Sequence, residues 1–88
     1  MLLPDYSARF KKDFKKFKHN PHVTNALNDV LNMLLHKTKL PEKYSDHQLG
    51  GPYVRYRECH IKPDVLLIYR TDEKFLYLSR IGSHSELF

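Results

Sequence analysis

The sequence predicts an α+β domain in which two N-terminal helices pack on an antiparallel sheet, in the order β-α-α-β-β-β. Apolar residues recur at helical spacing from residue 6 to residue 35, whereas residues 53–81 alternate or concentrate aliphatic and aromatic side chains between short polar turns. Two consecutive helices followed by three strands are typical of a sheet that is covered by helices on one face. The opposite face then lacks a helical cover and is free to form a ligand surface.

The chain has 88 residues, a net charge of +5 and a pI of about 9.4. This length indicates a single domain, residues 1–88. An excess of basic residues favours binding to polyanions or to an acidic protein, and it does not distinguish between these two kinds of partner. The single cysteine, Cys59, excludes an internal disulfide. No apolar run is long enough to cross a membrane. A charged residue also follows the first few residues too early for a signal peptide. We therefore expect a cytoplasmic protein without a membrane partner.

Residues 1–6 suit a short strand at a sheet edge, because Pro4 cannot donate a ladder hydrogen bond. The first helix is expected to start after Ser7 or Asp5 as N-cap and to end near residue 19. Successive aromatic residues on one face of this helix are four, four and three residues apart. A second helix is expected to follow Asn20 as N-cap, with Pro21 at its first position, and to extend to residues 36–37.

Lysines crowd the other face of the first helix, among them Lys11, Lys12 and Lys15. They suit either an RNA-phosphate surface or an ordinary solvated helix face. The sequence leaves both interpretations open.

A long loop, residues 38–52, precedes the predicted strands and carries His47. After this loop, one strand is expected over residues 53–59. Another is expected over residues 65–69, where uninterrupted apolar residues indicate burial on both faces. The turn through Pro63 leaves His60 and Asp64 at neighbouring strand ends. The last strand is expected over residues 75–81. Strict alternation places Arg80 on the same face as the apolar Leu76 and Leu78, which is an awkward position for a charge.

Three histidines, His47, His60 and His84, lie in loops or at strand ends, as do nearby charged residues (Arg57, Glu58, Asp64 and Arg80). RNA cleavage requires a base for the 2′-hydroxyl, an acid for the leaving oxygen and cations for the phosphate, and these residue types are sufficient. Cys59 alternates away from His60, which disfavours a Cys–His pair. Three histidines could also hold zinc, but they lack the close spacing of metal motifs. We therefore expect neither a metal nor a cofactor. In the plainest alternative, His60 and Asp64 simply occupy a hairpin turn.

Three motifs resemble those of YafQ-type toxins, a group within the RelE superfamily of bacterial toxin–antitoxin systems. They are D-H-x-L at residues 46–49, H-x-x-P-D at residues 60–64 and R-x-G-x-H-x-x-L-F at residues 80–88. The resemblance covers the whole chain in element order. It implies a RelE-like fold and a ribosome-dependent endoribonuclease that cleaves mRNA in the aminoacyl site and is neutralised by a cognate acidic antitoxin. A non-catalytic basic module that binds RNA or protein on the same fold is the alternative.

The resemblance extends to His47, His60, Asp64, Arg80, His84 and Phe88, each of which matches a motif position. We expect His84 to be the general acid, because a histidine just past the last strand can reach the leaving oxygen. Asp64 would orient an imidazole or accept the 2′-hydroxyl proton, while His47 and His60 complete the catalytic set. Arg57 and Arg80 would bind phosphate, and Phe88 would pack on a base. Val65 stands where some relatives have tryptophan, so any stacking by that ring is absent.

Overall fold

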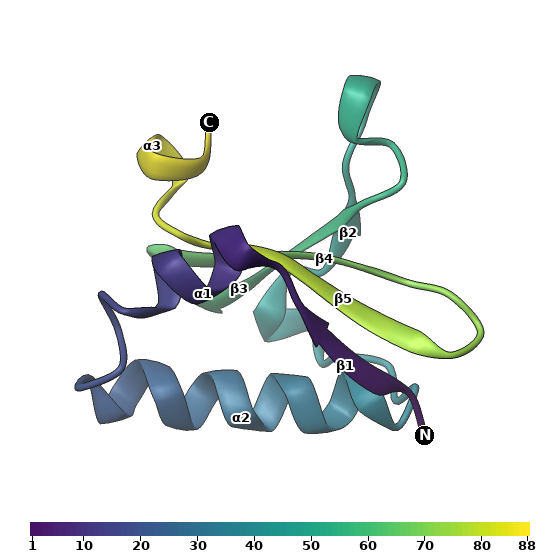
Figure 1. Ribbon diagram of the computed structural model, residues 1–88, viewed down its shortest axis with the longest axis horizontal. Helices are drawn as coiled ribbons and strands as arrows, with labels where there is room; N and C mark the ends of the chain where they lie inside the picture. Colours follow the sequence, from purple (N-terminus) through teal and green to yellow (C-terminus); the bar gives the residue numbers. More distant parts are fainter.

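The computed structural model describes residues 1–88 and contains one five-stranded sheet in the order β1-β5-β4-β3-β2 (Figure 1). All neighbouring strands are antiparallel except β1 and β5, which are parallel. The α+β prediction is confirmed, with a two-residue strand and a short C-terminal helix added to it. The elements are β1 Leu3–Tyr6, α1 Ala8–Phe14, α2 Pro21–Leu35, η1 Glu42–Tyr44, β2 His47–Gln48, η2 Gly51–Tyr53, β3 Arg57–Lys62, β4 Val65–Thr71, β5 Phe75–Gly82 and α3 His84–Leu87.

Helix α1 begins where the sequence predicted and ends earlier. The hydroxyl of its N-cap, Ser7, accepts a hydrogen bond from the Phe10 amide. The helix stops at Phe14 because the chain then tightens into turns, in which the Phe17 amide donates to the Phe14 carbonyl at 2.8 Å. Phe17 still packs against the core from this turn. Helix α2 is capped by Asn20, as expected, and Pro21 is its first residue.

The core lies between α2 and one face of the sheet (Figure 1). All five residues from Val65 to Tyr69 are buried, which confirms the prediction for this strand. Because side chains alternate along a strand, Val65, Leu67 and Tyr69 join the core beneath α2, whereas Leu66 and Ile68 point to the other face. From α2 the core receives Val23, Leu27, Val30, Leu31 and Leu34.

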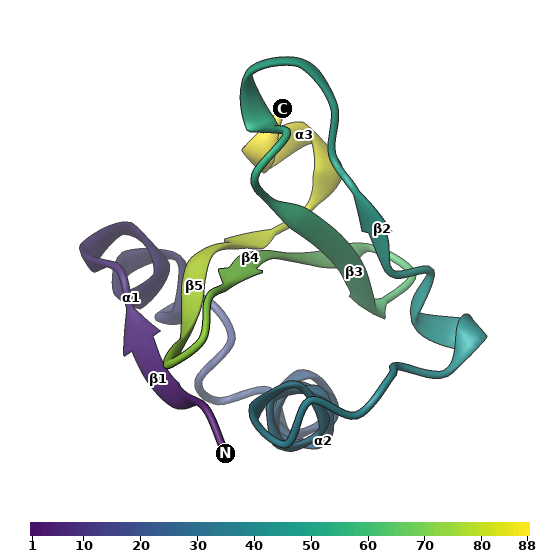
Figure 2. The same ribbon diagram turned by 90° about the vertical axis from the view of Figure 1, so that its right-hand side faces the viewer.

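The sheet face away from α2, hereafter the outer face, is partly covered. Figures 1 and 2 show that α3 and the β2–β3 loop both rise from it. Strand β3 starts at Arg57, four residues later than expected, because residues 51–53 form a 3-10 turn at the tip of this loop. Gly82 lets α3 approach closely, since a Cβ there would lie 3.3 Å from both Glu86 Oε1 and Leu87 Cδ2. None of the helices is long and apolar enough to cross a membrane.

Candidate functional site

Strand register gathers charged residues on the outer face in a row that crosses the sheet. Ile68 of β4 pairs with Glu58 of β3 on one side and with Arg80 of β5 on the other, and β2 places His47 opposite Glu58. Residues paired across a sheet point to the same face. The row therefore runs from His47 through Glu58 and Ile68 to Arg80. A parallel row, His60–Leu66–Gly82, lies beside it.

A β-bulge places Arg80 in this row and corrects the expectation from strict alternation. Tyr69 pairs with Leu78, whereas its neighbour Ile68 pairs with Arg80, so Ser79 is an extra residue in β5. The bulge turns Arg80 to the outer face and Ile81 into the core, where Ile81 is 1% exposed. The Ser7 hydroxyl donates to the Ser79 carbonyl at 2.9 Å, which satisfies the bulged backbone.

Glu58 lies between two of the predicted histidines. One of its oxygens, Oε1, is 3.6 Å from His47 Nε2 and 3.7 Å from His60 Nε2. The Nδ1 atom of His47 lies 2.8 Å from the Ser45 carbonyl, which fixes the ring with Nε2 toward the carboxylate. Glu58 is 7% exposed and is the one buried charged residue of the chain. These three side chains, the His47–Glu58–His60 cluster, form a compact group suited to proton transfer.

Sequence reasoning noted Glu58 among the nearby charges but gave the carboxylate role to Asp64. The structure places Asp64 at the exposed β3–β4 turn, where it makes no hydrogen bond or ion pair with His60. Glu58 stands two residues before His60 on the same strand, and this spacing, typical of one strand face, was the available signal.

Arg80 is held by a carboxylate from α1. Its Nε donates to Asp13 Oδ2 at 2.7 Å and its Nη2 donates to Asp13 Oδ1 at 3.2 Å. Asp13 Oδ2 also accepts the Ile81 amide. The Asp13 hydrogen bond raises the pKa of the Arg80 guanidinium. The fork of Arg80 is thereby fixed, with its remaining N–H groups left to meet a ligand.

Helix α3 carries His84, and contacts at its N-terminal turn fix its position. Ser83 and Glu86 form a capping box, and Lys16, in the turn after α1, forms an ion pair with Glu86. These contacts, led by Lys16, lower the pKa of Glu86 to about 2. The rings of His84 and Phe88 lie 5.3 Å apart, so the two C-terminal residues of the motif form one unit.

Arg57 lies on the other side of the sheet from the rest of the predicted site. It pairs with Tyr69 across β3 and β4, and Tyr69 belongs to the core face. The Asp46 carboxylate accepts from Arg57 at 3.2 and 3.3 Å and from the Tyr69 hydroxyl at 2.5 Å. Burial and the Asp46 hydrogen bond raise the pKa of Tyr69. The structure thus engages Arg57 in an ion pair that ties the β2 segment to the core.

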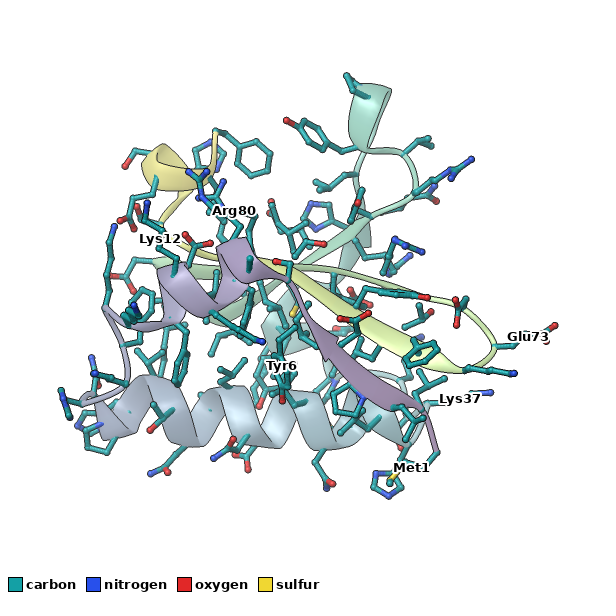
Figure 3. The ribbon with its side chains drawn as sticks, viewed as in Figure 1. Met1, Tyr6, Lys12, Lys37, Glu73 and Arg80 are labelled. Carbon is teal, nitrogen blue, oxygen red and sulfur yellow. The ribbon has the colours of Figure 1, made fainter.

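The lysines of α1 divide between two surfaces. Lys12 lines a groove with Arg9, Asp13, Lys16 and Arg80, between α1 and α3, and Figure 3 shows Lys12 and Arg80 on this side. Lys11 instead borders an apolar groove between α1 and α2. Lys15 is an exposed residue at the end of α1. Of the three, Lys12 is thus placed to extend the positive surface of Arg80.

Three further features bear on the chemistry. Burial raises the pKa of the Cys59 thiol to about 12, which makes it a poor nucleophile. A pocket of about 630 Å³ lies between α2 and the end of β3 and includes His60 but neither Arg80 nor His84. This pocket therefore does not coincide with the row of residues on the outer face. No group of three His, Cys, Asp or Glu side chains is placed to hold a metal ion.

Comparisons with known proteins agree with the sequence resemblance. Residues 2–88 match the family described as "Bacterial toxin of type II toxin-antitoxin system, YafQ". The mRNA interferase toxin YafQ of Escherichia coli K12 is 36% identical over 85 residues, which cover 96% of this chain and 92% of the relative. A copper-bound mutant toxin from Helicobacter pylori has a TM-score of 0.94 at 44% identity, with both chains fully covered. YafQ in the E. coli DinJ–YafQ complex has a TM-score of 0.88 at 34% identity, covering 100% and 99% of the two chains.

Proposed function

The chain belongs to the YafQ family of bacterial type II toxin–antitoxin toxins, and we propose that residues 1–88 act as a single mRNA interferase domain. In this proposal the protein cleaves mRNA in the ribosomal aminoacyl site by metal-independent acid–base transphosphorylation. The observation that carries the proposal is the arrangement on the outer face. The His47–Glu58–His60 cluster lies at one end of a cross-strand row, and Arg80 lies at the other.

The row has dimensions that suit a phosphodiester. One strand separates Glu58 from Arg80, so their backbones lie about 10 Å apart, and Ile68 forms an apolar floor between them. An RNA phosphate above Ile68 would meet a proton acceptor on one side and a guanidinium on the other. The cluster, which is suited to accept the 2′-hydroxyl proton, would supply the base. Arg80 would stabilise the charge that develops on the phosphate.

His84 is proposed as the general acid, because α3 folds back over β5 next to the Arg80 end of the row. It would protonate the 5′-oxygen as the phosphodiester bond breaks, leaving a 2′,3′-cyclic phosphate. Asp64 would act from the exposed turn by contacting the substrate, since the structure gives it no partner within the chain. Lys12 extends the positive surface along the groove beside Arg80.

The products of cleavage test this mechanism. Purified ribosome complexes with a defined mRNA should yield a 2′,3′-cyclic phosphate and a 5′-hydroxyl, identified by mass spectrometry, and a chelator selective for transition metals should not slow the reaction. His84→Ala should lower the cleavage rate by about 10²–10⁴-fold without a change in melting temperature. Asp64→Ala should also lower the rate at an unchanged melting temperature, because it removes a substrate contact. His36→Ala, at the exposed end of α2, is the matched control. A 5′-phosphate product, or a fully active His84→Ala, would refute the mechanism.

The proposed protein partner is a cognate acidic antitoxin. E. coli YafQ has been solved in complex with DinJ, and a net charge of +5 favours a segment rich in Asp and Glu. Co-expression with the neighbouring short gene should yield a stable, non-toxic complex. A protein that binds ribosomes or RNA but never cleaves them would favour the non-catalytic alternative instead.

A further inference from the structure

Two aromatic rings stand exposed at the rim of the outer face. Tyr53, at the tip of the β2–β3 loop, is 50% exposed, and Phe88, at the end of the chain, is 51% exposed. Their ring centroids lie 6.2 Å apart and their planes are at 89°. The edge of one ring therefore meets the face of the other, and the two rings form a right-angled aromatic corner.

The corner lies beside the proposed catalytic residues. The Phe88 ring is 5.3 Å from the His84 imidazole. Phe88 follows α3, and Glu86 of this helix lines one groove with Arg80, so the corner adjoins the arginine as well. A nucleotide whose phosphate binds Arg80 would thus carry its base within reach of both rings.

Each ring is supported by backbone contacts that do not involve the ring itself. The loop is closed by bonds from the Tyr53 amide to the Gly50 carbonyl at 3.2 Å and from the Tyr56 amide to the Tyr53 carbonyl at 2.8 Å. Gln48 Nε2 adds a bond to the Val54 carbonyl at 2.8 Å. Phe88 follows α3, which its capping box and Lys16 hold. The loop can therefore keep its shape when the Tyr53 ring is removed.

We propose that the Tyr53–Phe88 corner is a nucleobase subsite, which stacks one base of single-stranded RNA next to the cleaved phosphate. A planar base fits a right-angled corner because its face can lie on one ring while its edge meets the other. Stacking on aromatic side chains is a general way of holding single-stranded RNA. The subsite rests on the proposed function and adds to it a second, loop-borne ring that the sequence motifs did not indicate.

The test compares Tyr53→Leu, which removes the ring but keeps an apolar side chain, with Tyr53→Phe, which removes only the hydroxyl. Val54→Ala is the control, because Val54 is an equally exposed neighbour at 52%. On ribosome complexes, Tyr53→Leu should lower kcat/KM by about 5- to 150-fold, mostly through a higher KM. Tyr53→Phe should retain most of the wild-type value, and Val54→Ala should match it. A purely structural contact would instead lower the melting temperature of Tyr53→Leu and leave KM unchanged, which would overturn the subsite.

A second measurement does not depend on cleavage. Stacking quenches the fluorescence of 2-aminopurine placed in a single-stranded RNA oligonucleotide, so wild-type protein should quench it and Tyr53→Leu should not. Absence of cleavage by the wild type would refute the proposed function alone. Equal quenching by the two proteins, or none by either, would refute the nucleobase subsite.

Discussion

Replacement of Asp13 by asparagine is expected to lower the free energy of unfolding and the cleavage rate together. Asp13 is the carboxylate that accepts two hydrogen bonds from Arg80 and one from the Ile81 amide. Its side chain is 12% exposed and that of Arg80 is 25% exposed. Asparagine has the same shape, but it is neutral and presents N–H groups that cannot accept a bond from the guanidinium.

The magnitude follows from the number of bonds and their burial. A hydrogen bond to a charged group contributes about 1.5–3 kcal/mol, and an exposed ion pair contributes less than about 1 kcal/mol. Because one amide oxygen still accepts, and because Arg80 retains some contact with water, we expect a loss of about 2 kcal/mol. In a domain of this size that loss corresponds to a fall in melting temperature of about 8–16 °C.

Urea denaturation and single-turnover cleavage are the assays. Asp29→Asn is the matched control, since Asp29 is an exposed aspartate on α2 without an ion pair, and its replacement should cost less than about 0.5 kcal/mol. Below its denaturation midpoint, Asp13→Asn should still cleave more slowly than wild type, because Arg80 is no longer fixed. If Asp13→Asn were as stable and as active as Asp29→Asn, Asp13 would not be what positions Arg80.

Three further predictions concern other parts of the site. Glu58→Gln should remain folded and lose about 10²-fold or more in single-turnover cleavage, because the proposed base loses its carboxylate. Asp46→Asn should lower the melting temperature and slow cleavage less than Glu58→Gln does, because its bonds to Arg57 lie on the core face and act on His47 only by tying down the β2 segment; an unchanged melting temperature would contradict this. The pKa of Glu86 is lowered from 4.5 to about 2 in the folded protein. Its contribution to folding stability is therefore complete above pH 4.5 and disappears as the pH falls toward 2. NMR should therefore show α3 losing order over this range, and Lys16→Ala should raise the pH at which it does so.

The elements with strong local signals were predictable from the sequence. Asn20 and Pro21 mark the start of α2, and the run from Val65 to Tyr69 marks the buried central strand. Each signal depends on neighbours within a few residues. The early end of α1 and the late start of β3 could not be predicted. In both places aromatic residues continue the apolar pattern into a turn, although the helix or strand itself does not extend there.

Which charges meet in the site could be predicted only in part. Alternation along β5 placed Arg80 with Leu78, whereas a single extra residue, Ser79, moves it to the opposite face. A bulge depends on long-range contacts, here the bond from the Ser7 hydroxyl, and no pattern within β5 indicates it. The partners Asp13 and Arg80 are 67 residues apart, so their ion pair appears only when α1 is packed against β5.

Helix α1 and the residues that flank it contribute nothing to the proposed proton transfers, yet three of their contacts set the geometry of the site. Ser7 holds the bulge that turns Arg80 outward, Asp13 fixes the guanidinium, and Lys16 holds Glu86 in α3. A helix of seven residues is not stable alone, so these contacts exist only while α1 is docked on the sheet. The His47–Glu58–His60 cluster, in contrast, is supported by β2 and β3. The proposed base is therefore built into the sheet, whereas the phosphate-binding arginine and the acid depend on the docking of one short basic helix.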